Sequence, residues 1–230
     1  MEKEEEQNGF ESFSQAGQDA FVAAVYGNRR EALFVDLGAG DPIDGSNTYA
    51  LETRLGWRGI LADIATKEAL EAKRDSGHTI YGDALTLEVM SHIAALASEN
   101  HSFIEFLSLD LEPPELTLQC LVSLPLDTVD FGIICLEHDR YRRTDSIKGA
   151  MEGVLLRRGY QRVADDVRMI GTEDRDGKKF YGLVPVEDWW AHPAHVDVRR
   201  AAQIAAEIRF KTEYEFHMQC ARINAEEAAR

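Results

Sequence analysis

The sequence predicts an α/β fold with a mainly parallel sheet, and three observations support this class. Short apolar and β-branched runs recur along the chain, segments of helical spacing separate them, and the runs are continuously apolar instead of alternating with polar residues. Strand–helix–strand repeats of this kind make right-handed crossovers, so helices are expected on both faces of the sheet. The chain has 230 residues, 44% of them hydrophobic, which is enough to bury a sizeable core.

Five runs are expected to form the parallel strands, because each is flanked by polar or glycine-containing loops. These runs are residues 32–37, 59–63, 79–81, 103–109 and 129–136. Apolar residues three and four apart predict helices over 85–98 and 147–155. Residues 161–164 and 180–184 are expected to pair as antiparallel strands at the sheet edge, because segment 171–177 between them is rich in turn residues.

Three regions are expected along the chain. Residues 1–10 are acidic and nearly devoid of apolar groups, which predicts a disordered tail. Residues 11–190 form one domain, since neither a linker nor a second core interrupts them. From about residue 197, apolar residues at helical spacing predict a long helix. Residues 191–230 are therefore a C-terminal helical extension that packs on the domain or on a second copy of the chain, and in the latter case the protein is a homo-oligomer.

The charge of the chain excludes several kinds of partner. Lys and Arg number 25 against 41 Asp and Glu, a formal net charge of -16, and no basic run is present. We therefore expect neither nucleic acid nor anionic membranes as partners. No apolar run reaches the roughly 20 residues that span a bilayer, and the start lacks the features of a signal peptide. The three scattered cysteines suit buried thiols in a reducing compartment, so a cytoplasmic location is expected.

Residues that directly follow the predicted strands are candidates for a ligand site, because ligands of open parallel sheets bind outside the carboxyl ends of the strands. Gly38 and Gly40 follow the first strand and let the backbone approach a ligand closely. Asp63 ends the second strand, where a carboxylate can bind a ribose, and Asp83 follows the third, where it could accept from an adenine amino group. Each feature alone is more typical of a turn or a helix cap, but together they favour a nucleoside site.

Acidic side chains also follow the fourth and fifth strands. Asp110 ends the fourth strand, and Glu137 and His138 end the fifth. Neighbouring strands bring these residues to one edge of the sheet, where they could hold a divalent cation such as Mg²⁺ that activates a substrate hydroxyl. Alternatively, His138 acts alone as general base, or the group is only an acidic rim with a hydrogen-bonded histidine.

The segment that precedes the C-terminal helix carries two histidines and two tryptophans. His192 and His195 have a metal-like spacing, but Pro193 disfavours a continuous helix and no third ligand is nearby, so a surface connector is expected. Trp189 and Trp190 are expected to pack beneath the C-terminal helix.

Eight short blocks stand out in order along the chain. They are 14–19 (SQAGQD), 34–39 (FVDLGA), 46–52 (SNTYALE), 56–60 (GWRGI), 106–115 (FLSLDLEPPE), 137–138 (EH), 159–160 (GY) and 187–190 (EDWW). In this order they resemble the FkbM family of S-adenosylmethionine-dependent methyltransferases. The resemblance covers about residues 14–190, so the domain over 11–190 is expected to be a methyltransferase domain.

The resemblance implies a class I methyltransferase fold, which is Rossmann-like, with seven strands in a mostly parallel sheet and one antiparallel strand at the edge. Its implied cofactor is S-adenosylmethionine, and the residues implied to surround it are Gln15, Asp36, Gly38, Gly40, Asn47, Asp63 and Asp83. Asp36 and the two glycines would line the methionine part, Asp63 the ribose and Asp83 the adenine. Gln15 and Asn47 would lie near the same pocket.

The resemblance also implies an activity, because similar proteins methylate hydroxyl groups of small molecules or glycans. Asp110, Glu137 and His138 are the residues expected to carry catalysis, and their placing is similar to the metal site of small-molecule O-methyltransferases. Pro42 and Pro113 stand where the family usually has glycine. Proline fixes φ and removes a donor, so the substrate-side loop is expected to be reshaped.

Two other classes of function compete with an O-methyltransferase. A non-catalytic module that keeps the fold and acts in binding or assembly is motivated by the long C-terminal helix and the two prolines. A nicotinamide-dependent oxidoreductase would share the sheet and the ribose carboxylate, but Ile43 stands where its GxGxxG fingerprint needs a third glycine.

Overall fold

The computed structural model describes residues 10–75, 77–142, 145–175 and 178–228. The expected acidic tail, apart from its last residue, lies outside the described residues.

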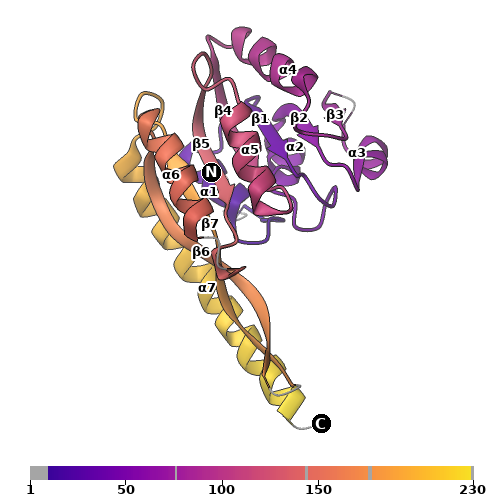
Figure 1. The fold of residues 1–230 in the computed structure, drawn as a ribbon, viewed down its shortest axis with the longest axis vertical. Helices are drawn as coiled ribbons and strands as arrows, with labels where there is room; N and C mark the ends of the chain where they lie inside the picture. Colours follow the sequence, from indigo (N-terminus) through magenta and orange to yellow (C-terminus); the bar gives the residue numbers. More distant parts are fainter. Residues whose placement is uncertain (1–9, 76, 143–144, 176–177, 229–230) are drawn as a thin grey trace, which may run out of the picture.

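Seven strands among the described residues form one sheet in the order β3-β2-β1-β4-β5-β7-β6. The strands are β1 (Leu33–Leu37), β2 (Arg58–Ala62), β3 (Thr79–Tyr81), β4 (Phe103–Leu109), β5 (Asp130–Glu137), β6 (Gln161–Arg175) and β7 (Lys178–Ala191). β1 to β5 are parallel, whereas β7 is antiparallel to β5 and β6. This order with one reversed strand is the class I methyltransferase fold, so the expected class is confirmed (Figure 1). The reversed strand is not the edge strand, because β6 lies outside it.

Helices cover both faces of the sheet. They are α1 (Gln18–Val25), α2 (Tyr49–Leu55), α3 (Lys67–Lys73), α4 (Leu87–Ser98), α5 (Pro114–Ser123), α6 (Asp145–Arg157), α7 (Val198–Ala228) and the short 3-10 helix η1 (Arg140–Arg142). One buried cluster joins the sheet to α4, α5 and α6, and the other joins it to α1, α2, α3 and α7. Because helices lie on both sides, each residue of β1 is buried, which explains why four of its five residues are apolar and only Asp36, near its carboxyl end, is charged.

The last two strands and the last helix extend beyond the rest of the sheet. β6 has 15 residues, β7 has 14 and α7 has 31, and together they form an arm that projects from the domain (Figure 1). The expected turn over 171–177 is therefore wrong for residues 171–175, which continue β6. Gly171 pairs with Gly182, and the amide of Asn224 on α7 bonds both the N–H and the C=O of Tyr181 at 2.9 Å. Contacts with the helix thus override the local turn signals.

The burial of the cysteine and tryptophan side chains tests the predictions made for them. Cys120, Cys135 and Cys220 are free and buried, as expected. Trp189 stacks on Phe21 at 4.5 Å in the cluster that contains α7, but Trp190 lies in the cluster on the opposite face of the sheet. The expectation for Trp190 is wrong because consecutive residues of a strand point to opposite faces. Within the described ranges, no helix combines the length and the apolarity that a membrane crossing requires.

Candidate functional site

Gly38 allows the loop after β1 to pass directly against the end of β4. It has a φ of 88°, and a Cβ at this position would lie 1.6 Å from the carbonyl oxygen of Asp110. The Gly38 N–H donates to the Ala62 carbonyl at 2.8 Å, and the Asp110 N–H donates to the Leu37 carbonyl at 2.9 Å. The ends of β1, β2 and β4 therefore meet at a point where only glycine fits.

Gly40 keeps the same loop open on one side. Its φ is 61°, and a Cβ would find no atom within 4 Å. On the other side the loop is held in place, because the Gly40 N–H donates to Asp63 Oδ2 at 3.1 Å and the Thr66 hydroxyl donates to the Gly40 carbonyl at 2.6 Å. The loop is thus fixed to the end of β2 while its backbone remains accessible.

A polar hollow lies beside this loop, at the carboxyl ends of β1, β4 and β5. The predicted residues that line it are Gln15, Asp36, Gly38, Gly40, Asn47, Asp110 and Glu137. Asp36 is buried and accepts a 2.7 Å hydrogen bond from the Thr48 hydroxyl. Burial raises the pKa of Asp36, against the opposing effects of Thr48 and Arg74. Asn47 donates to the Ser108 hydroxyl at 3.0 Å, which anchors its loop to β4.

A second, largely apolar hollow adjoins the first and shares Gly38, Gly40 and Asp110 with it. Its other walls come from the ends of β2 and β3 and from the start of α5, with Asp63, Ile64, Asp83, Ala84, Leu85 and Leu116 among them. Ile64 is 76% exposed, so its side chain forms an apolar wall open to solvent. The two hollows make one elongated site with a polar end and an apolar end.

Asp63 and Asp83 line this apolar end and also cap local structure. Asp63 Oδ1 accepts from the N–H groups of Ala65 and Thr66, each at 2.8 Å. Asp83 Oδ1 accepts from the Leu85 N–H at 2.8 Å. Asp63 and Asp83 can therefore each cap local structure and also take part in a nucleoside site.

Asp110 lies where the two hollows meet, and its carboxyl pairs with that of Glu137, which lines the polar hollow. Burial is the main cause that raises the pKa of both groups, and the charge of Asp110 raises that of Glu137 further. Two carboxyls in such proximity share a proton, so at neutral pH we assign the proton to Glu137 and the negative charge to Asp110.

The structure does not bring His138 into this group. His138 is buried, its Nε2 lies 3.2 Å from Asp188 Oδ1, and its Nδ1 accepts from the Arg140 N–H at 3.1 Å. Lys148 also approaches Asp188, at 3.0 Å, so the histidine belongs to a buried ionic network between β5, β7 and α6. His138 therefore does not join Asp110 and Glu137. The structure instead brings Glu112 and Asp139 to Glu137, with one ligand atom from each within 4.8 Å of the others, and Arg142 pairs with both Glu112 and Asp139.

Glu187 is the main site residue that the sequence analysis missed. It lies on β7 opposite Glu137, is buried and lines the polar hollow. Trp189 Nε1 donates to Glu187 Oε1 at 2.7 Å, and burial raises the pKa of Glu187 to about 7. Glu187 belongs to the EDWW block at 187–190, which could have drawn attention to it, but the block by itself indicates no role for this residue. Gln18, on α1, and Met169, on β6, complete this wall.

The histidines before α7 have structural contacts, as a connector would. His195 stacks on Phe103 at 4.2 Å and its Nε2 lies 2.9 Å from Asp130 Oδ2. His192 packs edge-on against Tyr160 at 4.9 Å. One ligand atom from each of Asp130, His192 and His195 lies within 4.8 Å of the others. However, the Nδ1 of His192 accepts from the Ala194 N–H, so its Nε2 carries the proton and is not free to bind a metal.

Comparisons with known proteins agree in fold class but are distant. The solved structures that resemble the chain include precorrin-6y C5,15-methyltransferase from Geobacter metallireducens, with 10% identity over 76% of this chain and 85% of that chain and a TM-score of 0.47. Another is precorrin 8w decarboxylase from Methanobacterium thermoautotrophicum, with 13% identity over 75% and 88% and a TM-score of 0.45. Similarity of this size carries no argument about activity, so the fold class rests on the strand order.

No family model matches the sequence, and no curated protein matches it. The resemblance to the FkbM family therefore stays a prediction.

Proposed function

We propose that the chain is an S-adenosylmethionine-dependent methyltransferase that acts on a hydroxyl group of a small molecule or glycan. The observation that supports this function best is the elongated site, in which a polar and an apolar hollow share Gly38, Gly40 and Asp110. S-adenosylmethionine has the same division, with a charged methionine part at one end and an adenine ring at the other. The site also lies at the carboxyl ends of the parallel strands, where this sheet architecture binds ligands.

The residues present fit this cofactor. In the apolar hollow, Ile64 offers a surface to the adenine, while Asp63 and Asp83 can accept from the ribose hydroxyls and the adenine amino group. Gly40 leaves open space for the ligand, since no atom lies within 4 Å of a Cβ at this position. In the polar hollow, buried carboxyls such as Asp36 favour the positive charges of the ammonium and sulfonium groups.

Asp110 is the residue that we propose as the general base. When bound, S-adenosylmethionine supplies a methyl group on a cationic sulfur, and an acceptor hydroxyl that attacks this methyl must lose its proton. Asp110 lies where the two hollows meet, and its carboxylate can take that proton while the carboxyl of Glu137 donates a hydrogen bond to it. The remaining contribution of the site is to hold the acceptor in line. No step is routed through a divalent cation, because His138, one of its three predicted ligands, lies in the ionic network around Asp188.

The walls of the polar hollow favour uncharged or cationic acceptors. Asp41, Asp44 and Glu187 line it together with Asp36, Asp110 and Glu137, and none of the described residues that line it is lysine, arginine or histidine. A phosphate on the acceptor would be repelled, which also disfavours nucleic acid. A neutral sugar or an alcohol fits this environment.

Calorimetric titration with S-adenosylmethionine and S-adenosylhomocysteine tests the cofactor. Both are expected to bind, and Ile64→Asp should weaken binding at least tenfold because it places a carboxylate against the adenine surface, a loss of about 1.4 kcal/mol. Leu87→Asp is the matched control, since Leu87 is 82% exposed and does not line the apolar hollow. Absence of binding to the wild-type chain, or equal binding by the two variants, would contradict the proposal.

Transfer from methyl-labelled cofactor to a panel of neutral hydroxyl compounds tests the reaction. Asp110→Ala should abolish turnover while cofactor binding stays within a few fold. If methylation survives in this variant, the assignment of the base is wrong. Cofactor binding without turnover on any compound of the panel would favour the competing interpretation, a non-catalytic binding module.

A further inference from the structure

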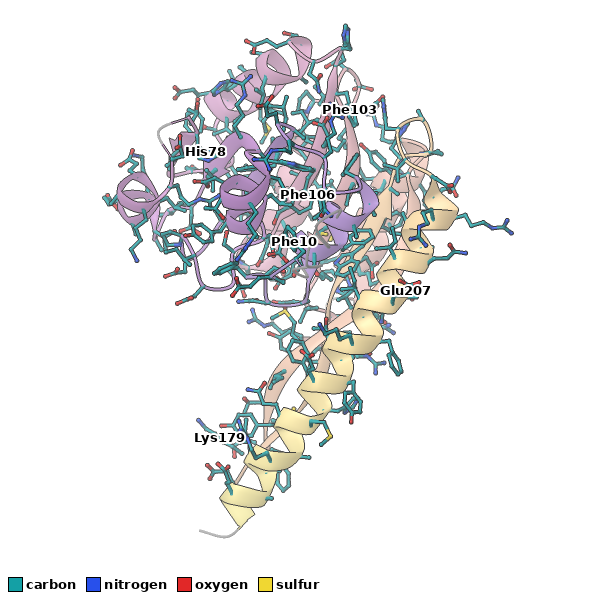
Figure 2. All side chains as sticks on the ribbon, turned by 180° about the vertical axis from the view of Figure 1, so that it is seen from behind. Phe10, His78, Phe103, Phe106, Lys179 and Glu207 are labelled. Atoms are coloured by element: carbon teal, nitrogen blue, oxygen red, sulfur yellow. The ribbon has the colours of Figure 1, made fainter. Side chains whose placement is uncertain are left out.

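The outward face of α7 carries an apolar stripe that no described residue covers. The inner side of the helix packs on the domain through Ala201, Ile204, Ala205 and Cys220. On the opposite side Phe210, Tyr214 and Met218 are 79%, 60% and 58% exposed. Residues four apart lie on one face of a helix, so these three side chains form a continuous stripe. Figure 2 shows α7 along the outside of the molecule, with the strands of the arm behind it.

The charges of α7 oppose the dipole of the helix. The part before Thr212 carries Arg199, Arg200, Arg209 and Lys211 against one acid, Glu207. The part from Thr212 onward carries Glu213, Glu215, Glu226 and Glu227 against one arginine, Arg222, and one histidine, His217. The first turn has no acid and the last turn has no base, and the acid at the start is Asp197, which precedes the helix and accepts from the Arg200 N–H at 3.0 Å. The dipole acts within the first and last turns, where the basic Arg199 and Arg200 and the acidic Glu226 and Glu227 are each unfavourable by about 0.3–1 kcal/mol.

We propose that a second copy of this chain packs antiparallel on the outer face of α7, with the two-fold axis at Tyr214. In this arrangement the basic half of each helix lies beside the acidic half of the other. The helix dipoles are also opposed. The charge distribution that disfavours the single helix therefore stabilises the pair.

The side chains along the stripe are complementary in size under this symmetry. A two-fold axis at Tyr214 places Phe210 opposite Met218, so the largest apolar groups meet near the centre. Farther out, Glu207 lies opposite Ala221 and Gln203 opposite Ala225. Long side chains on one helix therefore meet alanines on the other, which lets the two helices approach closely.

The axis at Tyr214 also creates a specific ion pair. Glu207 lies beside Arg222 of the second copy, because Arg222 directly follows the residue opposite Glu207. Within one helix the two residues are 15 positions apart, about 22 Å, so they cannot form this pair in a single chain. Both are exposed, and neither pairs with any residue that the structure describes.

This self-complementarity favours a second copy over an unrelated partner. An unrelated protein would need no relation between the two halves of α7. In α7 the side-chain charge changes from mainly basic to mainly acidic at about Tyr214. Long side chains before this residue also face alanines beyond it in the second copy. The interface is isologous, as closed dimers require. It does not depend on cofactor binding, so it is independent of the proposed activity.

Sedimentation equilibrium of the full chain tests the proposal. We expect a dimer for the wild type, and a monomer for Tyr214→Glu and for Met218→Glu, because each variant places two carboxylates near the axis. Leu156→Glu is the control, since Leu156 is 53% exposed on α6, away from the stripe, and this variant should remain dimeric. Circular dichroism verifies that the variants are folded. A wild-type chain that is monomeric at all concentrations overturns the proposal.

Charge reversal at one pair tests the antiparallel register. Glu207→Arg and Arg222→Glu should each weaken the dimer at least about tenfold, because each creates like charges across the interface. The double variant restores opposite charges and should return the dissociation constant to near the wild-type value. Singles that dimerise as the wild type does, or a double variant as weak as the singles, would rule out the pairing about Tyr214.

Discussion

Replacing Gly38 by alanine should disrupt the meeting point of β1 and β4. The new Cβ would lie 1.6 Å from the carbonyl oxygen of Asp110 and 2.6 Å from its carbonyl carbon. Both are backbone atoms, so no side chain can rotate away to make room. The ends of the two strands must separate, and the 2.9 Å hydrogen bond from the Asp110 N–H to the Leu37 carbonyl is then lost.

The size of this effect follows from three contributions. An alanine at a φ of 88° costs about 1–2 kcal/mol, because the left-handed region is unfavourable for residues with a Cβ. Relief of the overlap by a backbone shift costs about 1–3 kcal/mol, and the lost hydrogen bond about 1 kcal/mol. We expect the free energy of unfolding to fall by about 3–6 kcal/mol, and binding of S-adenosylmethionine to be lost with the loop geometry.

Gly40→Ala is the matched control for this measurement. Gly40 also has a positive φ, of 61°, but a Cβ there meets nothing within 4 Å. Its cost is therefore the conformational term alone, about 1–2 kcal/mol. Urea unfolding followed by circular dichroism measures both variants. If Gly38→Ala destabilises the protein no more than Gly40→Ala does, the close approach of Gly38 to Asp110 is not present in the protein.

Two further predictions concern the ends of β7. Burial raises the pKa of Glu187 from its usual 4.5 to about 7, so between these values the folded state holds a proton that the unfolded chain has released. The stabilising contribution of Glu187 is complete below about pH 4.5 and is lost as the pH rises through about 7, by about 3 kcal/mol in total. Glu187→Gln should therefore become more stable relative to the wild type by up to this amount across that window; a difference in denaturation midpoint that does not change with pH would contradict it. At the other end of the strand, Asn224→Ala removes both hydrogen bonds to the Tyr181 backbone and should speed hydrogen exchange of the Tyr181 amide by about tenfold, with the amide of Leu107 in β4 as the unaffected reference.

The parallel half of the sheet could be predicted closely because its strands are buried on both sides. β3 and β4 begin and end at the predicted residues, β1 begins one residue later than predicted, and β2 and β5 are each displaced by one residue at both ends. The arm could not be predicted in the same way. Residues such as Gly171 carry turn signals, and they remain in β6 because α7 supports the hairpin from a position more than 40 residues farther along the chain.

In the candidate site too, residues placed by their own strand could be predicted, whereas a residue placed by long-range strand pairing could not. Gly38, Gly40, Asp63 and Asp83 line one site because each follows a parallel strand, which the sequence reveals. Glu187 could not be found from spacing, because it reaches the site through antiparallel pairing with Glu137, 50 residues earlier. The misplacement of His138 has a simpler cause, since adjacent residues at the end of a strand point to opposite faces.

The pairing of β5 with β7 has a consequence for how this chain can vary in evolution. The alignment of Glu137 with Glu187 and of Cys135 with Trp189 fixes β7 from inside the domain, without help from the hairpin tip. A one-residue slip would exchange Glu187 with Asp188 and place the wrong carboxylate in the polar hollow. Insertions or deletions at the distal end of the arm leave this alignment unchanged. Arm length is therefore free to diverge among descendants of this sequence while the chemistry of the pocket is inherited intact.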